Sequence, residues 1–187
     1  MALVDGVSCG FVTTAPVDDP SPGGTSTFDG YSGATKFTSP ADMDSIISMG
    51  AWIVDGGTAT GNVQFGIYSH DAANDRPGTL LGSSGDISKD TTDNRWLSAT
   101  FTVSGLSGNT IYWLAMQADT VTGSVLAGSE TNTYKSDYRG PGETELPGTW
   151  GVSDGTAGRM RGIYAVYTAA AGGAVLTGYL STMKGIW

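Results

Sequence analysis

The chain has 187 residues, enough for one compact domain with a sizeable core. Eighteen acidic and nine basic residues give a net charge of −9, and no cluster of Lys or Arg is present that could follow a phosphate backbone, so nucleic acid is not an expected partner. Charged residues are only 14% of the chain and glycine reaches 29 residues, a composition that suits short strands joined by tight turns.

The single cysteine, Cys9, excludes an intrachain disulfide and any metal site built from several cysteines, and we expect it to be a small buried hydrophobic residue. No stretch approaches the ~20 apolar residues of a membrane helix, so no membrane span is expected. The first residues lack the basic start and apolar run of a secretory signal. Either a signal has been removed or the protein leaves the cell without one, as phage structural proteins do on lysis. Both alternatives predict a virion or extracellular location.

Residues 1–33 are predicted to form a short N-terminal strand followed by a Pro/Gly-rich arm, because residues 15–33 hold three of the seven prolines and have no helical periodicity. From residue 34 onward, short runs rich in β-branched and aromatic residues recur between turn signals, which is typical of a sandwich or barrel. The predicted strands are Ala34–Thr38, Ser45–Val54, Asn62–Ser69, Thr79–Ser83, Trp96–Val103, Thr110–Gln117, Gly162–Thr168 and Ala174–Leu180.

A two-residue period separates the core side of these strands from the solvent side. Val63, Phe65 and Ile67 are predicted to share one buried face, and the run Trp96–Val103 has the same alternation. In Ile111–Gln117 the apolar residues are nearly continuous, which predicts a central strand covered on both faces. Helix is expected to be scarce.

Two later regions differ from this pattern. Residues 119–161 are polar and Gly-rich, and they predict short strands with an irregular excursion at one end of a sandwich domain spanning 34–168. Residues 169–187 read as a small-residue linker followed by an apolar segment that needs a surface to bury against, so they are predicted to be an assembly tail. The predicted assembly residues are Val175, Leu176, Tyr179, Leu180, Met183, Ile186 and Trp187.

The order of motifs in residues 45–118 resembles a recurring pattern. A "G-I-Y" strand at Phe65–Ser69 is followed by a "P-G-T-L-L" return at 77–81, by Trp96, and by "Y-W-L-A" at Tyr112–Ala115. This is similar to a jelly-roll-like sandwich of bacterial extracellular proteins and phage structural proteins. The resemblance implies an antiparallel, jelly-roll-like β-sandwich, and it names a scaffold rather than a chemistry.

A physical reading of the same segment gives a hairpin. Proline presets φ and glycine accepts the left-handed region, so Pro77 and Gly78 are predicted to form a turn pair. The strands Gly61–Ser69 and Thr79–Ser83 would then pair across the loop.

Candidates for catalysis are few. His70 is the only histidine, its neighbour Ser69 would point to the opposite face of the strand, and no Gly-x-Ser-x-Gly elbow accompanies them. A glycosidase would need two carboxylates about 5–10 Å apart, and the only glutamates, Glu130, Glu143 and Glu145, lie in the irregular region. We therefore expect no enzymatic activity and no cofactor, with a structural calcium ion as the one possible bound group.

Aspartates crowd the two loops that flank Thr79–Ser83, where oxygen-rich loops could hold calcium. They are Asp71, Asp75, Asp86, Asp90 and Asp93. Their spacing does not match an EF-hand loop, and the alternative is a solvated turn face in which Asp71, Asn74 and Asp93 bond the backbone.

Aromatic side chains offer the best ligand candidates. We expect Trp52, Trp96 and Trp113 to pack in the core, because they lie in predicted strands. Aromatic and Arg side chains in the 119–161 region could stack on a sugar and bond its hydroxyls. The predicted ligand residues are Tyr134, Tyr138, Arg139 and Trp150.

Two functions follow from these features. The first is a non-enzymatic virion or surface protein, such as a phage decoration, spike or fibre subunit, that forms homo-oligomers or binds other virion or surface proteins through its terminal arms. The alternative is a carbohydrate-binding adhesin that presents loop aromatics to a cell-surface glycan.

Overall fold

The computed structural model describes residues 2–54, 60–90, 94–122 and 126–170, and it confirms the all-β prediction. No helix occurs in these four ranges, and accordingly they hold none with the length and hydropathy needed to cross a bilayer. The strands are β1 (Gly10–Val12), β2 (Gly24–Thr27), β3 (Ser32–Thr38), β4 (Met43–Ile53), β5 (Thr60–Asp71), β6 (Arg76–Ser83), β7 (Ile87–Lys89), β8 (Arg95–Ser104), β9 (Ile111–Thr122), β10 (Leu126–Arg139), β11 (Gly155–Arg161) and β12 (Ile163–Ala169).

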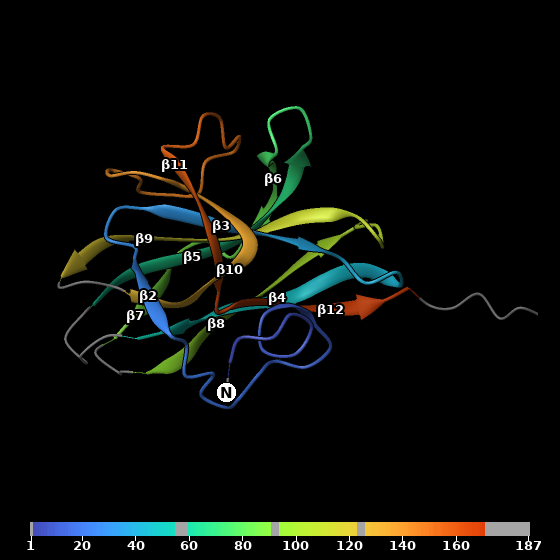
Figure 1. Ribbon diagram of the computed structural model, residues 1–187, viewed down its shortest axis with the longest axis horizontal. Coiled ribbons are helices and arrows are strands. Elements are labelled where there is room, and N and C mark those ends of the chain that lie inside the picture. The colour runs from blue at the N-terminus through green and yellow to red at the C-terminus, as the bar shows by residue number, and fades with distance from the viewer. Residues whose placement is uncertain (1, 55–59, 91–93, 123–125, 171–187) are drawn as a thin grey trace, which may run out of the picture.

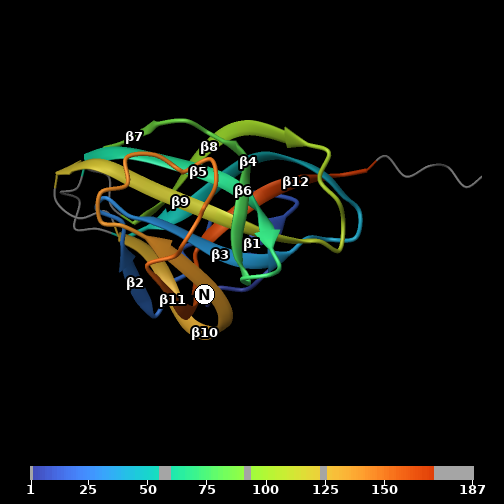
Figure 2. The same cartoon turned by 90° about the horizontal axis from the view of Figure 1, so that it is seen from above.

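The strands form one mixed sheet that doubles over into two layers, as a sandwich does (Figures 1 and 2). The first layer contains β1, β12, β4 and β8, and the second contains β10, β3, β9, β5 and β6, with β2 and β11 on β10 and β7 on β5. A single residue pair, Ile53 with Ala127, joins the layers between β4 and β10. Neighbouring strands are antiparallel except β1 and β12, which are parallel.

One segment passes from the second layer to the first. β11 pairs with β10 and β12 pairs with β4, so the chain changes layers at Gly162 between them. The Gly162 N–H donates to the carbonyl of Gly128 at 2.8 Å, and the Gly162 carbonyl accepts from the N–H of Trp52 at 2.7 Å. These bonds hold a corner where a strand switches sheets.

The main core lies between the layers and follows the predicted alternation. Val63, Phe65 and Ile67 of β5 are completely buried there, facing Ile46 and Met49 of β4. Each such side chain contributes roughly 1.5–3 kcal/mol by leaving water.

The central strand β9 is covered on both faces, as its continuous apolar run predicts. Leu114 and Met116 belong to the main core, while Trp113 and Ala115 belong to a second cluster on the outer face of the second layer. Loop residues 140–154 complete that second cluster with Leu146 and Trp150.

The predicted N-terminal arm lies partly against its own domain. Ala15 packs on a small cluster that includes Val12 and Tyr164, and the indole N–H of Trp96 donates to the carbonyl of Asp18 at 3.0 Å. This part of residues 1–33 therefore covers the outer face of the first layer.

Seven of the eight predicted strands correspond to β3, β4, β5, β6, β8, β9 and β12. The eighth, Ala174–Leu180, and all the predicted assembly residues fall in 171–187, outside the described residues. The region 119–161 is more regular than its composition predicts, because it contains β10 and β11 in addition to loop 140–154.

The β5–β6 hairpin forms as predicted, but its turn lies earlier. Residues 72–75 form the turn, and Pro77 and Gly78 are part of β6. The Asp71 carboxylate accepts the backbone N–H groups of Ala73 at 3.2 Å and Asn74 at 3.3 Å, which closes the turn before the Pro-Gly pair is reached.

Candidate functional site

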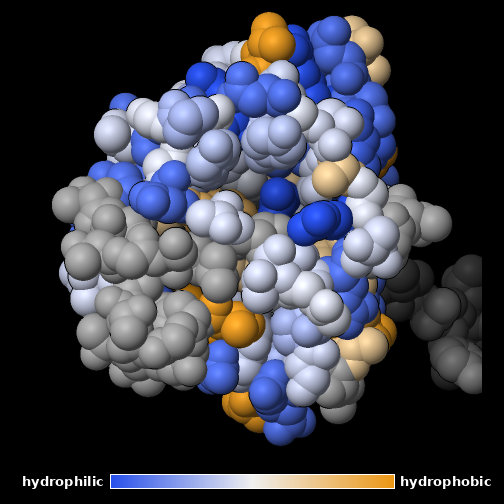
Figure 3. Space-filling view, turned by 60° about the vertical axis from the view of Figure 1, so that its left-hand side comes forward, coloured by the Kyte–Doolittle hydropathy of each residue, from blue (hydrophilic) through white to orange (hydrophobic). Residues whose placement is uncertain are grey.

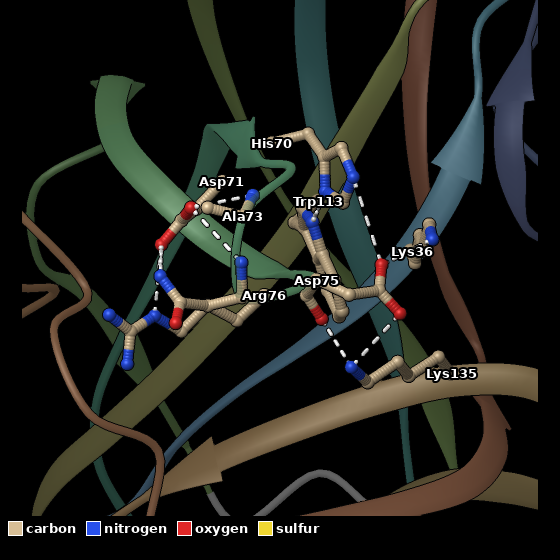
Figure 4. A network of polar contacts seen from close by, with 9 residues as sticks. Lys36, His70, Asp71, Ala73, Asp75, Arg76, Trp113 and Lys135 are labelled. Atoms are coloured by element: carbon tan, nitrogen blue, oxygen red, sulfur yellow. Dashed lines mark hydrogen bonds and ion pairs between the residues drawn. The ribbon is translucent and has the colours of Figure 1, made fainter.

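A polar cluster, here called the Asp75 network, lies on the outer face of the second layer (Figure 4). It consists of Lys36 from β3, His70 from β5, Trp113 from β9, Lys135 from β10, and Asp75 from the β5–β6 turn. The Lys36 ammonium donates to Oδ1 of Asp75 at 2.5 Å, and Lys135 Nζ lies 3.1 Å from Oδ2. These bonds, the one from Lys36 first, hold the pKa of the Asp75 carboxyl below its usual value. The network therefore ties three strands of the layer to the hairpin.

His70 has both ring nitrogens directed at protein groups. Its Nδ1 accepts a hydrogen bond from the Trp113 indole at 3.1 Å, and its Nε2 lies 3.7 Å from Oδ1 of Asp75. The hydroxyl of Ser69 instead accepts the backbone N–H of Thr79 at 3.0 Å within the hairpin. The two side chains serve separate structural contacts.

The predicted calcium ligands do not come together. Asp71 pairs with Arg76 at 3.1 Å, Asp90 with Arg95 at 2.9 Å, and Asp86 accepts from Gln64 at 2.6 Å, whereas Asp75 belongs to the network above. Asp93 lies outside the described residues. Within the described ranges no three His, Cys, Asp or Glu side chains are grouped to hold a metal ion. Asp71, Asp75, Asp86 and Asp90 are therefore partners of cations and amides on the protein.

Two of the predicted ligand residues hold loop 140–154 in place. Trp150 has 0% of its surface exposed, and its indole N–H donates to the Ser153 hydroxyl at 3.2 Å, so it is no stacking platform. Arg139 pairs with Glu143 at 3.1 Å and donates to the carbonyl of Trp150. The prediction that Trp150 presents its ring to a ligand is wrong because the ring fills the second cluster.

Tyr134 is engaged at another place. Its hydroxyl donates to Asp5 at 2.8 Å, and its ring centroid lies 5.5 Å from that of Phe37. Burial and the Asp5 carboxylate raise the pKa of Tyr134 to about 12. This tyrosine fastens the N-terminal segment to β10.

Tyr138, by contrast, borders a groove that we call the tyrosine groove. The groove has a volume of about 630 Å³, within the range of small-molecule sites. β2, β3, β10, β11 and the 28–31 turn supply its walls. The lining residues are Thr25, Thr27, Phe28, Tyr31, Ser32, Gly33, Tyr138, Thr156, Ala157, Arg159 and Arg161.

Two glycines, one at the start of β11 and one just after β10, make room for the aromatic rings of the groove. A Cβ on Gly155, which pairs with Tyr138, would lie 2.3–2.6 Å from atoms of its phenol, so this ring lies against the bare backbone at Gly155. A Cβ on Gly140 would lie 2.5 Å from the Tyr31 ring. The centroids of the two tyrosine rings are 6.4 Å apart, with the planes tilted by 59°.

Arg161 lies at the inner wall with only 6% of its surface exposed. Its Nη1 donates to the carbonyl of Ala34 at 2.9 Å, and its guanidinium lies 5.3 Å from the centroid of the Phe28 ring. Gly33 gives both side chains their space, since a Cβ there would lie 2.8 Å from Phe28 and 2.9 Å from Arg161. Burial, followed by the charge of Arg159, lowers the pKa of Arg161 to about 10, so the group stays charged at neutral pH.

Of the residues that line the groove, the sequence pattern predicted Tyr138 as a ligand candidate. It did not predict Phe28, Tyr31, Arg159 or Arg161. A usable signal existed for the arginines, because positions 159 and 161 share one face of any strand. The other residues come from the 28–31 turn, and only the long-range pairing of β10 with β2, β3 and β11 brings them beside the arginines.

Comparison of the chain with family models, with curated proteins and with solved structures gives no match. The resemblance to a jelly-roll family therefore stays a prediction, and the functional argument depends on the groove itself.

Proposed function

We propose that this chain is a non-enzymatic surface protein of a virion or extracellular assembly, and that it binds a glycan in the tyrosine groove. The observation that carries this proposal is the pair of tyrosine rings, Tyr31 and Tyr138, held at the groove by glycines. Of the two functions expected from the sequence, this favours the carbohydrate-binding one. Tyr138 stays a candidate ligand residue, and Tyr31 takes the stacking role that the sequence analysis gave to Trp150.

The chemistry of the groove suits a sugar. Tyrosine rings offer apolar faces to the C–H groups of a pyranose, and their hydroxyls remain wet. Three threonines, Thr25, Thr27 and Thr156, add hydroxyl groups around the same hollow. The groove thus combines flat apolar faces with hydrogen-bonding groups, which is what a ligand with one apolar face and a rim of hydroxyls requires.

One side of the molecule is mostly hydrophilic. On the side shown in Figure 3, apolar residues form a few separate patches in a mostly hydrophilic surface, outside the area that grey atoms cover. A large contiguous apolar patch is the usual mark of a protein-docking face. The visible part of this side has none.

The polar groups most suited to catalysis are occupied in structural contacts, which supports a non-enzymatic role. Both nitrogens of His70 face protein partners. The Glu143 carboxylate pairs with Arg139, and Glu130 accepts the backbone N–H of Leu3 at 3.0 Å.

The test is a glycan array followed by calorimetry on the best hit. Tyr138→Ala should weaken binding by about tenfold or more, because it removes one stacking face. Tyr138→Phe keeps that face and should bind within about threefold of the wild type. Tyr134→Ala, on the same strand but outside the groove, is the matched control and should bind normally. An array without hits, or equal loss in both alanine variants, would overturn the proposal.

Self-assembly as a decoration, spike or fibre subunit is the second proposal, and one edge of the sheet supports it. β8 pairs with β4 along one edge, and no described strand pairs with its opposite edge. An open edge of this kind can accept a strand from a second chain. The apolar pattern of residues 175–187 provides a candidate strand. Deletion of residues 172–187 should lower the mass in solution or abolish particle binding; unchanged assembly would reject this proposal.

A further inference from the structure

The tyrosine groove is positively charged in a strongly acidic protein. The whole chain carries −9, yet the groove is lined by Arg159 and Arg161 and by no Asp or Glu among its described lining residues. Field lines in a cleft with one sign of charge concentrate ligands of the opposite sign. A neutral sugar has no net charge for this field to concentrate.

Arg161 lacks a full set of protein partners. Apart from the Ala34 carbonyl and the Phe28 ring, the described residues give its side chain no hydrogen bond or ion pair, and its Nε has no hydrogen-bond acceptor. Asp137 is near enough to act on the pKa of Arg161 but forms no ion pair with it in the described structure. A buried guanidinium without a carboxylate costs folding free energy.

Arg159 faces the same hollow from two positions earlier in β11. Its Nη1 donates to the carbonyl of Thr25 at 3.4 Å, which places its guanidinium beside β2. A guanidinium binds a carboxylate or sulfate more strongly than a neutral acceptor, because charge assistance roughly doubles the strength of such hydrogen bonds.

We infer that the tyrosine groove selects an acidic glycan, whose anionic group pairs with Arg161 and Arg159 while its sugar ring stacks on Tyr31 and Tyr138. This inference depends on the proposed function, which it makes more specific. The anion supplies the ion-pair partner that Arg161 lacks among the described residues. The two tyrosines explain why the anion should be carried by a sugar and not be a free ion.

A second hollow extends the site along β2. It has a volume of about 650 Å³ and shares Thr25 and Arg159 with the tyrosine groove. Glu130 also lines it, and the Glu130 carboxylate accepts the backbone N–H of Leu3. Two hollows joined through shared residues favour an oligosaccharide over a single sugar.

The experiment compares an acidic glycan with its neutral ester and with a second acidic glycan. The intact protein is titrated by calorimetry with a galacturonate trimer, with its methyl ester, and with a sulfated galactose trimer. The free acid should bind at least about tenfold more tightly than the ester, and 0.5 M NaCl should reduce this ratio. The sulfated trimer distinguishes the two kinds of anion. If it binds more tightly than the ester, any anion suffices; if it does not, a carboxylate is required. Both results support an acidic ligand when the free acid exceeds the ester.

Variants of the two arginines test whether these side chains cause the preference for the acid. Arg159→Gln should remove most of the preference for the acid, measured as the ratio of the acid and ester affinities of the same variant. Arg161→Lys, which keeps the buried charge but not the planar fork, should reduce the preference by about threefold to tenfold. Arg76→Gln, which breaks an ion pair in the distant hairpin, is the matched control and should change neither. Equal affinities of acid and ester would overturn this inference and leave glycan binding standing, whereas no binding of any glycan would overturn both.

Discussion

The indole N–H of Trp113 donates a hydrogen bond of 3.1 Å to Nδ1 of His70, and the two rings are nearly parallel, with 28° between their planes. Trp113 has 0% of its surface exposed, so its N–H depends on His70 for a partner. Because Nδ1 is the acceptor, the proton of the neutral imidazole is on Nε2, on the side of Asp75. The only histidine of the chain thus accepts the indole hydrogen bond of a buried tryptophan.

Replacement of His70 by alanine should therefore destabilise the protein. The indole donor of Trp113 would lose its acceptor in a buried position, a loss of about 1–3 kcal/mol. His70→Gln offers an amide oxygen to the same donor and should lose less. Urea denaturation followed by tryptophan fluorescence measures both, and a His70→Ala protein as stable as the wild type would contradict the structural role.

Trp150 provides a second test, since the structure moves it from the predicted ligand site into a core. Its ring meets that of Tyr68 edge to face at a centroid distance of 5.1 Å. Trp150→Ala should reduce the free energy of unfolding by about 3–5 kcal/mol, as expected for a fully buried indole. Tyr138→Ala, with 37% of the residue exposed, should lose less than about 1.5 kcal/mol. The same urea series compares them, and equal losses would contradict the assignment of Trp150 to the core.

The strands that could be predicted from the sequence are those with a clear local pattern of hydrophobic residues. In β5 and β9, alternating or continuous apolar residues marked both the strand and its buried face. β10 carries Ser, Thr, Asn, Lys and Asp along most of its length, and it becomes a strand because β3 and β11 pair with it on both sides. Tertiary pairing overrides weak local propensity in such a case.

The groove could not be predicted from the sequence for a related reason. Tyr31 and Tyr138 are separated by more than half of the chain, and their rings meet only because Tyr138 pairs with Gly33 in the β3–β10 register. Register between distant strands depends on the whole sheet and cannot be read from spacing. What the sequence alone could offer was a set of aromatic residues in 119–161, of which one, Tyr138, lines the groove.

A pH-dependent prediction concerns Asp137, whose carboxyl is buried on β10. The Ser153 hydroxyl donates to Oδ2 at 2.9 Å, Oδ1 has no partner in the described structure, and burial raises the pKa of this carboxyl above 3.8. The folded protein then holds this proton more tightly than the unfolded chain. Its contribution to the free energy of unfolding therefore decreases as pH rises from the unfolded pKa through the folded one.

Asp137→Asn removes this pH-dependent loss and can still accept the Ser153 bond. The variant should gain stability relative to the wild type as pH rises from 3 to 7, and the difference should level off above the folded pKa of Asp137. Urea midpoints of both proteins across this range measure the difference. A variant that becomes relatively less stable toward pH 7 would show that the ionised carboxylate is favoured in the folded state.

The connection between β8 and β9 contains a glycine that no other residue should replace. A Cβ on Gly108 would lie 2.0 Å from the carbonyl oxygen of Ala41 and 2.8 Å from that of Pro40, and both are backbone atoms. The two segments are held together by hydrogen bonds from the backbone N–H of Ser39 to the Thr110 carbonyl at 2.9 Å and from the N–H of Asn109 to the Ser39 carbonyl at 3.2 Å. The added methyl group must therefore push the connection away from the turn before β4.

Gly108→Ala should consequently lower stability by about 1–3 kcal/mol or more, the usual cost of forcing a group into closely packed structure. Gly148→Ala is the matched control, because a Cβ there would meet nothing within 4 Å, and it should be neutral or stabilise by up to about 1 kcal/mol through the unfolded chain. Thermal unfolding of the two variants gives the comparison. If Gly108→Ala melted with the control, the close approach of the connection to residues 40 and 41 would be refuted.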